Sequence, residues 1–130
     1  LGAEGVQIGT RFALTYESSA SDVFKEYCLR LNEGDTKLLL KKLAPTRLVT
    51  NSFRDAVEAA EGRGASADEL RELLGKGRAK KGIFEGDLEE GELEIGQVAA
   101  LFRQQQSVSE VMKELVEGYE RGIKNLEERM

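Results

Sequence analysis

Gly9 and Thr10 are the residues of this sequence whose types and order most directly suggest a binding function. Before them, the β-branched Val6 and Ile8 alternate with the polar Gln7, a pattern typical of a short strand. A glycine at the end of a strand lets a ligand approach the backbone closely, because no Cβ stands in the way. The Gly9 amide, with the amide and hydroxyl of Thr10, could then bind phosphate oxygens. An ordinary turn also explains a Gly-Thr pair after a strand, so spacing alone leaves both interpretations open.

The complete stretch of residues 1–12, LGAEGVQIGTRF, favours the binding interpretation. It resembles the last barrel strand and phosphate loop of the nitronate monooxygenase family, formerly called 2-nitropropane dioxygenase, which includes flavin-containing enoyl-acyl-carrier-protein reductases. The resemblance implies an α/β fold, namely the C-terminal part of a (β/α)₈ TIM barrel with FMN over the C-terminal ends of its strands. Barrels of this kind often hold phosphate at the loops after strands seven and eight. The resemblance therefore implies that Gln7, Gly9 and Thr10 contact FMN.

Two later stretches extend the resemblance. Gly96-Gln97 is similar to a Gly-Gln pair that enters a small-residue helix in the family, which implies that both residues lie near the flavin-side pocket. The related enzymes also carry Pro-x-Arg followed shortly by Asn in a segment after the barrel. Here those residues are Pro45, Arg47 and Asn51. They could shape the substrate side of the site, and a plain structural loop explains them equally well.

The order of elements divides the chain into three parts. Residues 1–35 are predicted to hold the last barrel strand, the FMN-phosphate loop and a following helix. Residues 36–106 are predicted to form a mostly helical excursion and the return to the barrel, beginning with strands at residues 36–40 and 47–50. Residues 107–130 are predicted to form a C-terminal docking helix.

Capping signals and apolar spacing predict where the helices lie. Ser66 with Glu69 and Ser107 with Glu110 form capping boxes, in which serine and glutamate exchange hydrogen bonds with each other's backbone amides. One apolar stripe is expected to run from residue 70 to residue 84, and a longer one from residue 108 to residue 126. The acidic run at residues 85–94 lacks the spacing of a calcium-binding loop, so we expect a solvated loop and no metal site.

Composition narrows the classes of partner and compartment. The net charge of −5 argues against nucleic acid or an anionic membrane as the main partner, because both attract basic surfaces. No run approaches the ~18 consecutive apolar residues of a membrane-spanning helix. Cys28 is the single cysteine and falls on an apolar stripe, so we expect a buried structural thiol and a reducing cytoplasm.

The length and the lack of histidine indicate an incomplete enzyme. The sequence has 130 residues, whereas an eight-stranded barrel typically needs about 250. We therefore interpret the chain as the C-terminal portion of a larger enzyme that requires the remainder of the barrel. It contains no histidine, the residue type that the resemblance makes the catalytic base, so we expect no catalytic residue in this chain. A homodimer is also possible.

Three functions are compatible with these observations. The favoured one is part of an FMN-dependent oxidoreductase that oxidises small alkyl nitronates with O₂. The alternative is an FMN-dependent enoyl-acyl-carrier-protein reductase that takes hydride from NAD(P)H. The third is a small helical interaction module without a cofactor, whose intact purified protein would be colourless.

Overall fold

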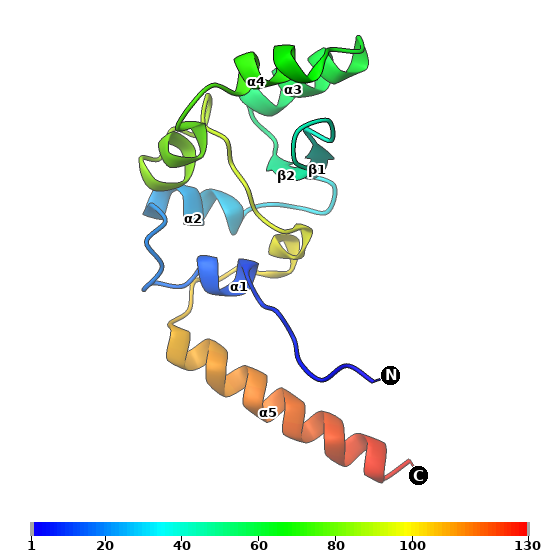
Figure 1. Cartoon of the computed structure of the whole chain (residues 1–130). Helices are drawn as coiled ribbons and strands as arrows, with labels where there is room; N and C mark the ends of the chain where they lie inside the picture. Colours follow the sequence, from blue (N-terminus) through cyan, green and yellow to red (C-terminus); the bar gives the residue numbers. More distant parts are fainter. Residues whose placement is uncertain (1, 130) are drawn as a thin grey trace.

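The computed structural model describes residues 2–129, which form a curved series of short elements that ends in one long helix (Figure 1). Helices α3 and α4 lie at one end with the hairpin β1–β2, and α5 lies at the other end. Helices α1 and α2 lie between them. In chain order the elements are α1 (Thr10–Ala13), α2 (Asp22–Cys28), β1 (Thr36–Leu39), β2 (Thr46–Val49), α3 (Ser52–Gly62), α4 (Ala67–Leu74), the π-helix η1 (Lys80–Phe84), the 3₁₀ helix η2 (Gln97–Leu101) and α5 (Val108–Glu127).

The predicted N-terminal strand is wrong for this structure. Residues 2–9 adopt no regular secondary structure, and Val6 is almost fully exposed. A strand needs a neighbour to pair its backbone amides and carbonyls, and the described residues place no strand beside this segment. Gly9 instead precedes α1, where its carbonyl accepts a hydrogen bond from the Ala13 amide at 2.9 Å.

The two strands predicted after residue 35 are confirmed. β1 and β2 pair antiparallel, with Thr36 opposite Val49 at one end of the register. The Val49 amide donates to the Leu93 carbonyl at 2.9 Å, and Leu48 forms an isolated bridge with Glu94. The hairpin therefore holds the segment that leads into η2.

A helical cap packs on the hairpin. The Asn51 side chain caps α3 by accepting from the Arg54 amide at 2.8 Å, and the predicted Ser66–Glu69 capping box begins α4. The hairpin and both helices share one apolar cluster: Leu39, Leu40, Leu48, Phe53, Val57, Ala60, Ala65 and Leu70. This cluster forms one end of the molecule (Figure 1).

The predicted apolar stripe from residue 70 to residue 84 is not one helix. α4 ends at Leu74, because Gly75 and Gly77 adopt positive φ angles of 65° and 72°. The chain then turns before the short π-helix η1. Arg78 bonds the end of α4, its Nε donating to the Leu74 carbonyl at 2.7 Å. The positive charge of Arg78 therefore lies at the C-terminal end of α4, where the helix dipole is negative.

A second apolar cluster joins the middle of the chain: Leu14, Phe24, Cys28, Leu31, Val49, Leu93, Ile95 and Ala99. It brings α2 and β2 against the segment that precedes η2. Cys28 lies fully inside this cluster, and burial raises the pKa of its thiol to about 12. The expected buried thiol is confirmed.

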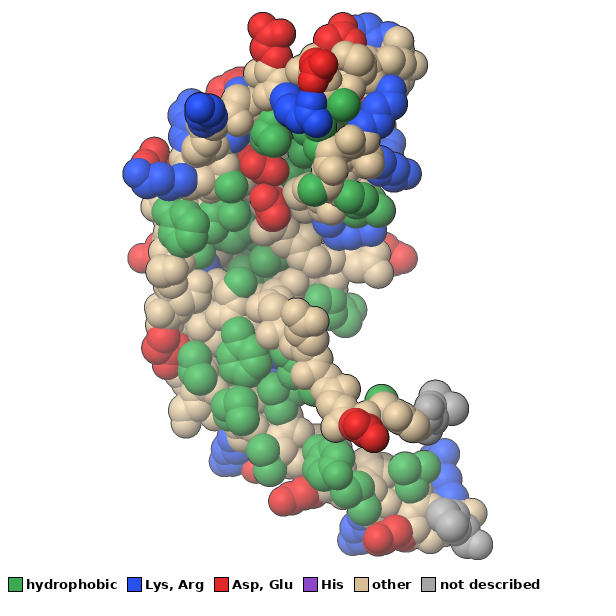
Figure 2. Space-filling view, in the orientation of Figure 1, with side chains coloured by type: hydrophobic (Ala, Val, Ile, Leu, Met, Phe, Trp, Pro, Cys, Tyr) green, Lys and Arg blue, Asp and Glu red, His purple; other side chains and the backbone are tan. Residues whose placement is uncertain are grey.

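Helix α5 is attached mainly at its first turns. The predicted Ser107–Glu110 capping box is present, and Glu17 accepts hydrogen bonds from the Val108 amide at 3.0 and 3.1 Å. Arg11 of α1 pairs with Glu114. Beyond this point the apolar stripe is exposed, as the space-filling view shows (Figure 2). Within this chain, the predicted docking is therefore seen only near the start of the helix.

No helix among residues 2–129 combines the length and the apolar character needed to cross a bilayer.

The acidic run at residues 85–94 is not simply a solvated loop. Glu92 and Leu93 are buried, with only 8% and 1% of their surface exposed to solvent. Gly82 and Gly91 allow this close packing, because a Cβ on Gly82 would lie 2.7 Å from the Leu93 side chain. Burial, reinforced by the neighbouring Glu94 carboxylate, raises the pKa of the Glu92 carboxyl to about 7.

We predict that Glu92 makes the folded state less stable as pH rises. Its folded pKa lies above the ordinary glutamate value of 4.5, so its stabilising effect is complete below about pH 4.5 and is lost as pH rises through 7. The melting temperature of the intact protein should therefore fall from pH 5 to pH 8. The fall should be smaller in Glu92→Gln, while the exposed control Glu72→Gln should keep the wild-type slope. If the melting temperature of Glu92→Gln fell with pH as steeply as that of wild type, the raised pKa of Glu92 would be contradicted.

Candidate functional site

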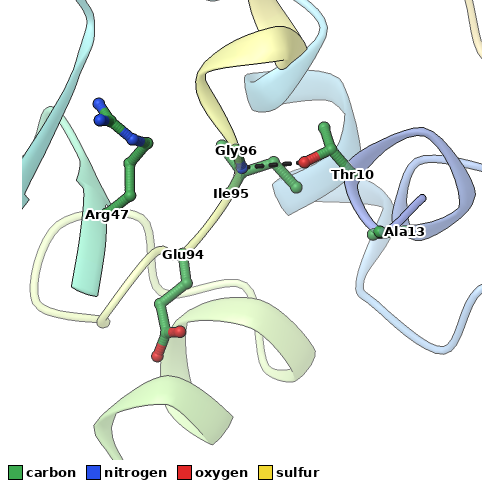
Figure 3. Close-up of a pocket in the computed structure, with 7 residues that line it drawn as sticks. Thr10, Ala13, Arg47, Glu94, Ile95 and Gly96 are labelled. Carbon is green, nitrogen blue, oxygen red and sulfur yellow. Dashed lines mark hydrogen bonds between the residues drawn. The ribbon is translucent and has the colours of Figure 1, made fainter. Parts of the chain in front are cut away.

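Three distant segments surround one open hollow of about 470 Å³. The segments are the start of α1, strand β2 and residues 94–96 before η2 (Figure 3). The lining residues are Gly9, Thr10, Ala13, Arg47, Glu94, Ile95 and Gly96. The hollow thus combines backbone amides, one hydroxyl, one guanidinium group and one carboxylate.

A hydrogen bond between Thr10 and Gly96 closes one side of this hollow. The Gly96 amide donates to Thr10 Oγ1 at 3.0 Å, as the dashed line in Figure 3 marks. Because this oxygen accepts from Gly96, the hydroxyl hydrogen of Thr10 is available to donate to a ligand. A Cβ on Gly96 would lie far inside van der Waals contact with the same oxygen, so a side chain there would separate the two segments.

Arg47 brings a positive charge to the hollow. Its Nη1 donates to the carbonyl of Thr36 at 3.4 Å and to Thr36 Oγ1 at 3.2 Å, which fixes the guanidinium group against β1. None of the ion pairs formed among residues 2–129 includes Arg47. Figure 3 shows the Glu94 side chain directed away from Thr10 and Gly96. The lining of the hollow therefore carries one guanidinium group and one carboxylate.

The structure brings together three of the five predicted site residues. Gly9, Thr10 and Gly96 all line the hollow, although 86 positions separate Thr10 from Gly96. Gln97 faces a neighbouring groove instead. Gln7 is exposed and is not among the residues that line the hollow. Contact of Gln7, Gly9 and Thr10 with FMN stays a prediction.

Arg47 and Asn51, from the Pro-x-Arg and Asn pattern, have different roles in the structure. Arg47 lines the hollow, whereas the side chain of Asn51 has structural partners. Besides capping α3, Asn51 Nδ2 donates to the carbonyls of Leu88 and Gly91 at 3.0 and 2.8 Å. For Asn51, the interpretation as a plain structural loop therefore holds.

Three residues of the hollow, Ala13, Glu94 and Ile95, were not predicted as site residues from the sequence. Glu94 was assigned to the end of a solvated acidic loop. A signal was present, because acidic and apolar residues alternate from Glu92 to Ile95 with the period of a strand. From Leu93 to Ile95 the structure follows this alternation, with Leu93 and Ile95 buried and Glu94 exposed, whereas Glu92 is buried as well.

Comparison with known proteins gives consistent results. A sequence model of the nitronate monooxygenase family matches residues 1–118. A "probable nitronate monooxygenase" of Bacillus subtilis (strain 168) is 55% identical over 38 residues, or 29% of this chain and 11% of that protein. The structure of FabK from Thermotoga maritima matches 99% of this chain with 28% identity and a TM-score of 0.86. A mutant form of that FabK matches 99% of the chain with 26% identity and a TM-score of 0.80.

These relatives are longer than this chain. The chain spans 41% and 38% of the two FabK chains and a smaller share of the curated relative.

We predict that Gly96→Ala separates α1 from the segment before η2. The added methyl group would overlap Thr10 Oγ1, and overpacking of this kind typically costs about 1–3 kcal/mol. Hydrogen–deuterium exchange of residues 10–14 should become faster in the intact variant. Gly118→Ala is the matched control, because its Cβ would meet only a distant arginine side chain on the exposed face of α5. Equal exchange at residues 10–14 in both variants would show that the Thr10–Gly96 contact does not hold α1.

Proposed function

Because this chain belongs to the nitronate monooxygenase family, we propose that it forms the phosphate-binding part of an FMN-dependent oxidoreductase. FabK, a flavin enoyl-acyl-carrier-protein reductase of the same family, supports a flavin enzyme. The observation that carries the proposal is the hydrogen bond between Thr10 and Gly96. This bond joins the segment of Gly9 and Thr10 to the segment of Gly96 and Gln97. The resemblance implies that the first contacts FMN and that the second lies near the flavin-side pocket.

The residues around the hollow fit a phosphate monoester. The Thr10 hydroxyl can donate one hydrogen bond, and Arg47 supplies a positive charge. The helical hydrogen bonds of α1 begin with the Ala13 amide, so the amides of residues 10–12 have no partner within the helix. Gly96 has no Cβ, which lets the Thr10 hydroxyl lie against its backbone. These features support Gly9 and Thr10 as the phosphate contacts, with Gly96 as the residue that positions the Thr10 hydroxyl.

The role that we assign to this chain is binding and orientation. FMN, when bound, would supply hydride and electron transfer through its ring system. Gly9 and Thr10 would hold the phosphate end, and the contact with Gly96 would fix the direction in which the Thr10 hydroxyl donates. A cofactor held at its phosphate can present its ring at a constant position to a substrate. We assign no proton-transfer step to residues of this chain.

For the whole protein, we favour oxidation of alkyl nitronates with O₂. The family model and the Bacillus subtilis relative support this choice. The second candidate is reduction of an enoyl thioester by NAD(P)H. One observation favours it: the match with FabK covers 99% of this chain, including the hairpin and the helical cap beyond the hollow.

We predict that Gly9→Val and Thr10→Val each weaken FMN binding to the intact protein. Valine at position 9 would occupy the space of the phosphate approach, and Thr10→Val removes a hydroxyl donor. Loss of a hydrogen bond to a charged group costs about 1.5–3 kcal/mol, so the dissociation constant should rise about 10- to 100-fold. Thr10→Ser keeps the hydroxyl and should retain most of the affinity. Flavin fluorescence titration of the apoprotein measures these values, and wild-type affinity in Gly9→Val would exclude this phosphate site.

A substrate comparison decides between the two candidate reactions. The flavin-loaded intact protein is assayed with propionate 3-nitronate and O₂, and separately with crotonyl thioester and NAD(P)H. We expect faster turnover of the nitronate than of the thioester. The opposite preference would replace the favoured function by the second candidate, and a purified protein without visible flavin absorbance would refute both.

A further inference from the structure

A second depression, the Arg47–Arg103 groove, lies next to the proposed phosphate hollow. It has a volume of about 770 Å³ and is lined by Glu33, Gly34, Thr36, Arg47, Gln97, Val98, Ala100, Leu101 and Arg103. Arg47 lines both depressions, so the groove adjoins the hollow, and residues of η2 form part of its lining. A ligand in this groove would lie beside the flavin phosphate rather than in its place.

Two guanidinium groups in the groove are fixed by backbone or hydroxyl oxygens and not by carboxylates. Arg47 is held by Thr36, and Arg103 Nη1 donates to the Leu31 carbonyl at 2.7 Å. Like Arg47, Arg103 takes part in none of the ion pairs that the described residues form. Most other arginines among the described residues do have a carboxylate partner. The groove therefore holds two positioned positive charges that form no ion pair within residues 2–129.

The remaining lining gives the groove two kinds of surface. Val98 and Leu101 are 41% and 76% exposed and form an apolar wall along η2. Glu33 carries the one negative charge among the lining residues, so the two arginines leave the groove with a net positive charge. A ligand that matches this pattern has a phosphate group and, joined to it, an extended part of low polarity.

We propose that the Arg47–Arg103 groove binds the phosphate of a second, organic substrate of the flavin enzyme. Guanidinium groups bind phosphate oxygens with paired, charge-assisted hydrogen bonds. The same phosphate chemistry has two possible sources: the phosphopantetheine arm of an acyl thioester and the pyrophosphate of a nicotinamide dinucleotide. This inference rests on the proposed flavin enzyme and adds to its second candidate reaction, because a small nitronate carries no phosphate.

A purely structural role for Arg103 makes a different prediction. If Arg103 only joined residue 103 to the Leu31 carbonyl, its replacement would lower stability and leave ligand affinity unchanged. If it binds phosphate, affinity for phosphate-bearing ligands must fall while affinity for the same ligand without phosphate stays constant. Binding measurements on matched ligand pairs therefore separate the two roles.

The experiment uses the intact protein loaded with FMN. Calorimetry measures the affinity for 4′-phosphopantetheine, for pantetheine without the phosphate, and for NADH. The variants are Arg103→Met, which removes the charge, and Arg103→Lys, which keeps a positive donor if the methionine variant does not fold. Arg63→Met is the matched control, because Arg63 is an exposed arginine outside the groove without an ion pair among the described residues.

We expect wild-type protein to bind 4′-phosphopantetheine or NADH, and Arg103→Met to weaken that binding about 10-fold or more. The affinity for pantetheine should not change. The affinity of Arg103→Lys for the phosphate-bearing ligand should lie between those of wild type and Arg103→Met, and that of Arg63→Met should match wild type. Weaker binding of phosphopantetheine alone identifies the thioester arm as the ligand, and weaker binding of NADH alone identifies the dinucleotide. A rise in ionic strength should also weaken the binding of the phosphate-bearing ligand.

Unchanged affinity for both phosphate-bearing ligands in Arg103→Met, or no binding of either ligand to wild type, would overturn the groove assignment. This failure is separate from failure of the proposed function. Protein that retains FMN but shows unchanged ligand affinity refutes the groove alone, whereas protein that never binds FMN refutes the flavin enzyme itself.

Discussion

The hydrogen bond from the Gly96 amide to Thr10 is the interaction on which the hollow depends. It joins the first helix to a segment 86 positions later and excludes any side chain at position 96. That segment is itself held by β2, through the bond between Val49 and Leu93. The start of α1, the hairpin and the chain before η2 are therefore positioned together, and a displacement of any one would open the hollow.

The loop before Gly96 is placed by contacts that have no direct part in binding. The side-chain oxygen of Asn51 caps the start of α3, and its side-chain amide nitrogen donates hydrogen bonds to two carbonyls of the loop. Gly82 and Gly91 let the loop pass close to η1, which buries Glu92 and raises the pKa of its carboxyl. The acidic loop is thus part of the scaffold that places Gly96.

Local signals were sufficient to predict the hairpin, the capping residues and the long last helix, because each depends on residues close in sequence. The N-terminal strand could not be judged in the same way, since pairing requires a partner strand, and residues 2–129 place none beside Val6. The prediction that one helical stripe continues beyond Leu74 was wrong, because Gly75 and Gly77 adopt positive φ angles that end the helix despite the apolar spacing. Gly9, Thr10 and Gly96 were found through family resemblance, whereas the place of Arg47 beside them depends on tertiary packing.

A crystal structure of the intact protein with FMN tests the central claim most directly, because it locates the phosphate without any assay. The account predicts the phosphate in the hollow, with one oxygen at a hydrogen-bonding distance of about 2.7 Å from Thr10 Oγ1 and others near the amides that follow Gly9. It also predicts that the bond between Thr10 and Gly96 is retained. A phosphate bound elsewhere, with the hollow empty or filled by a side chain, would contradict the account.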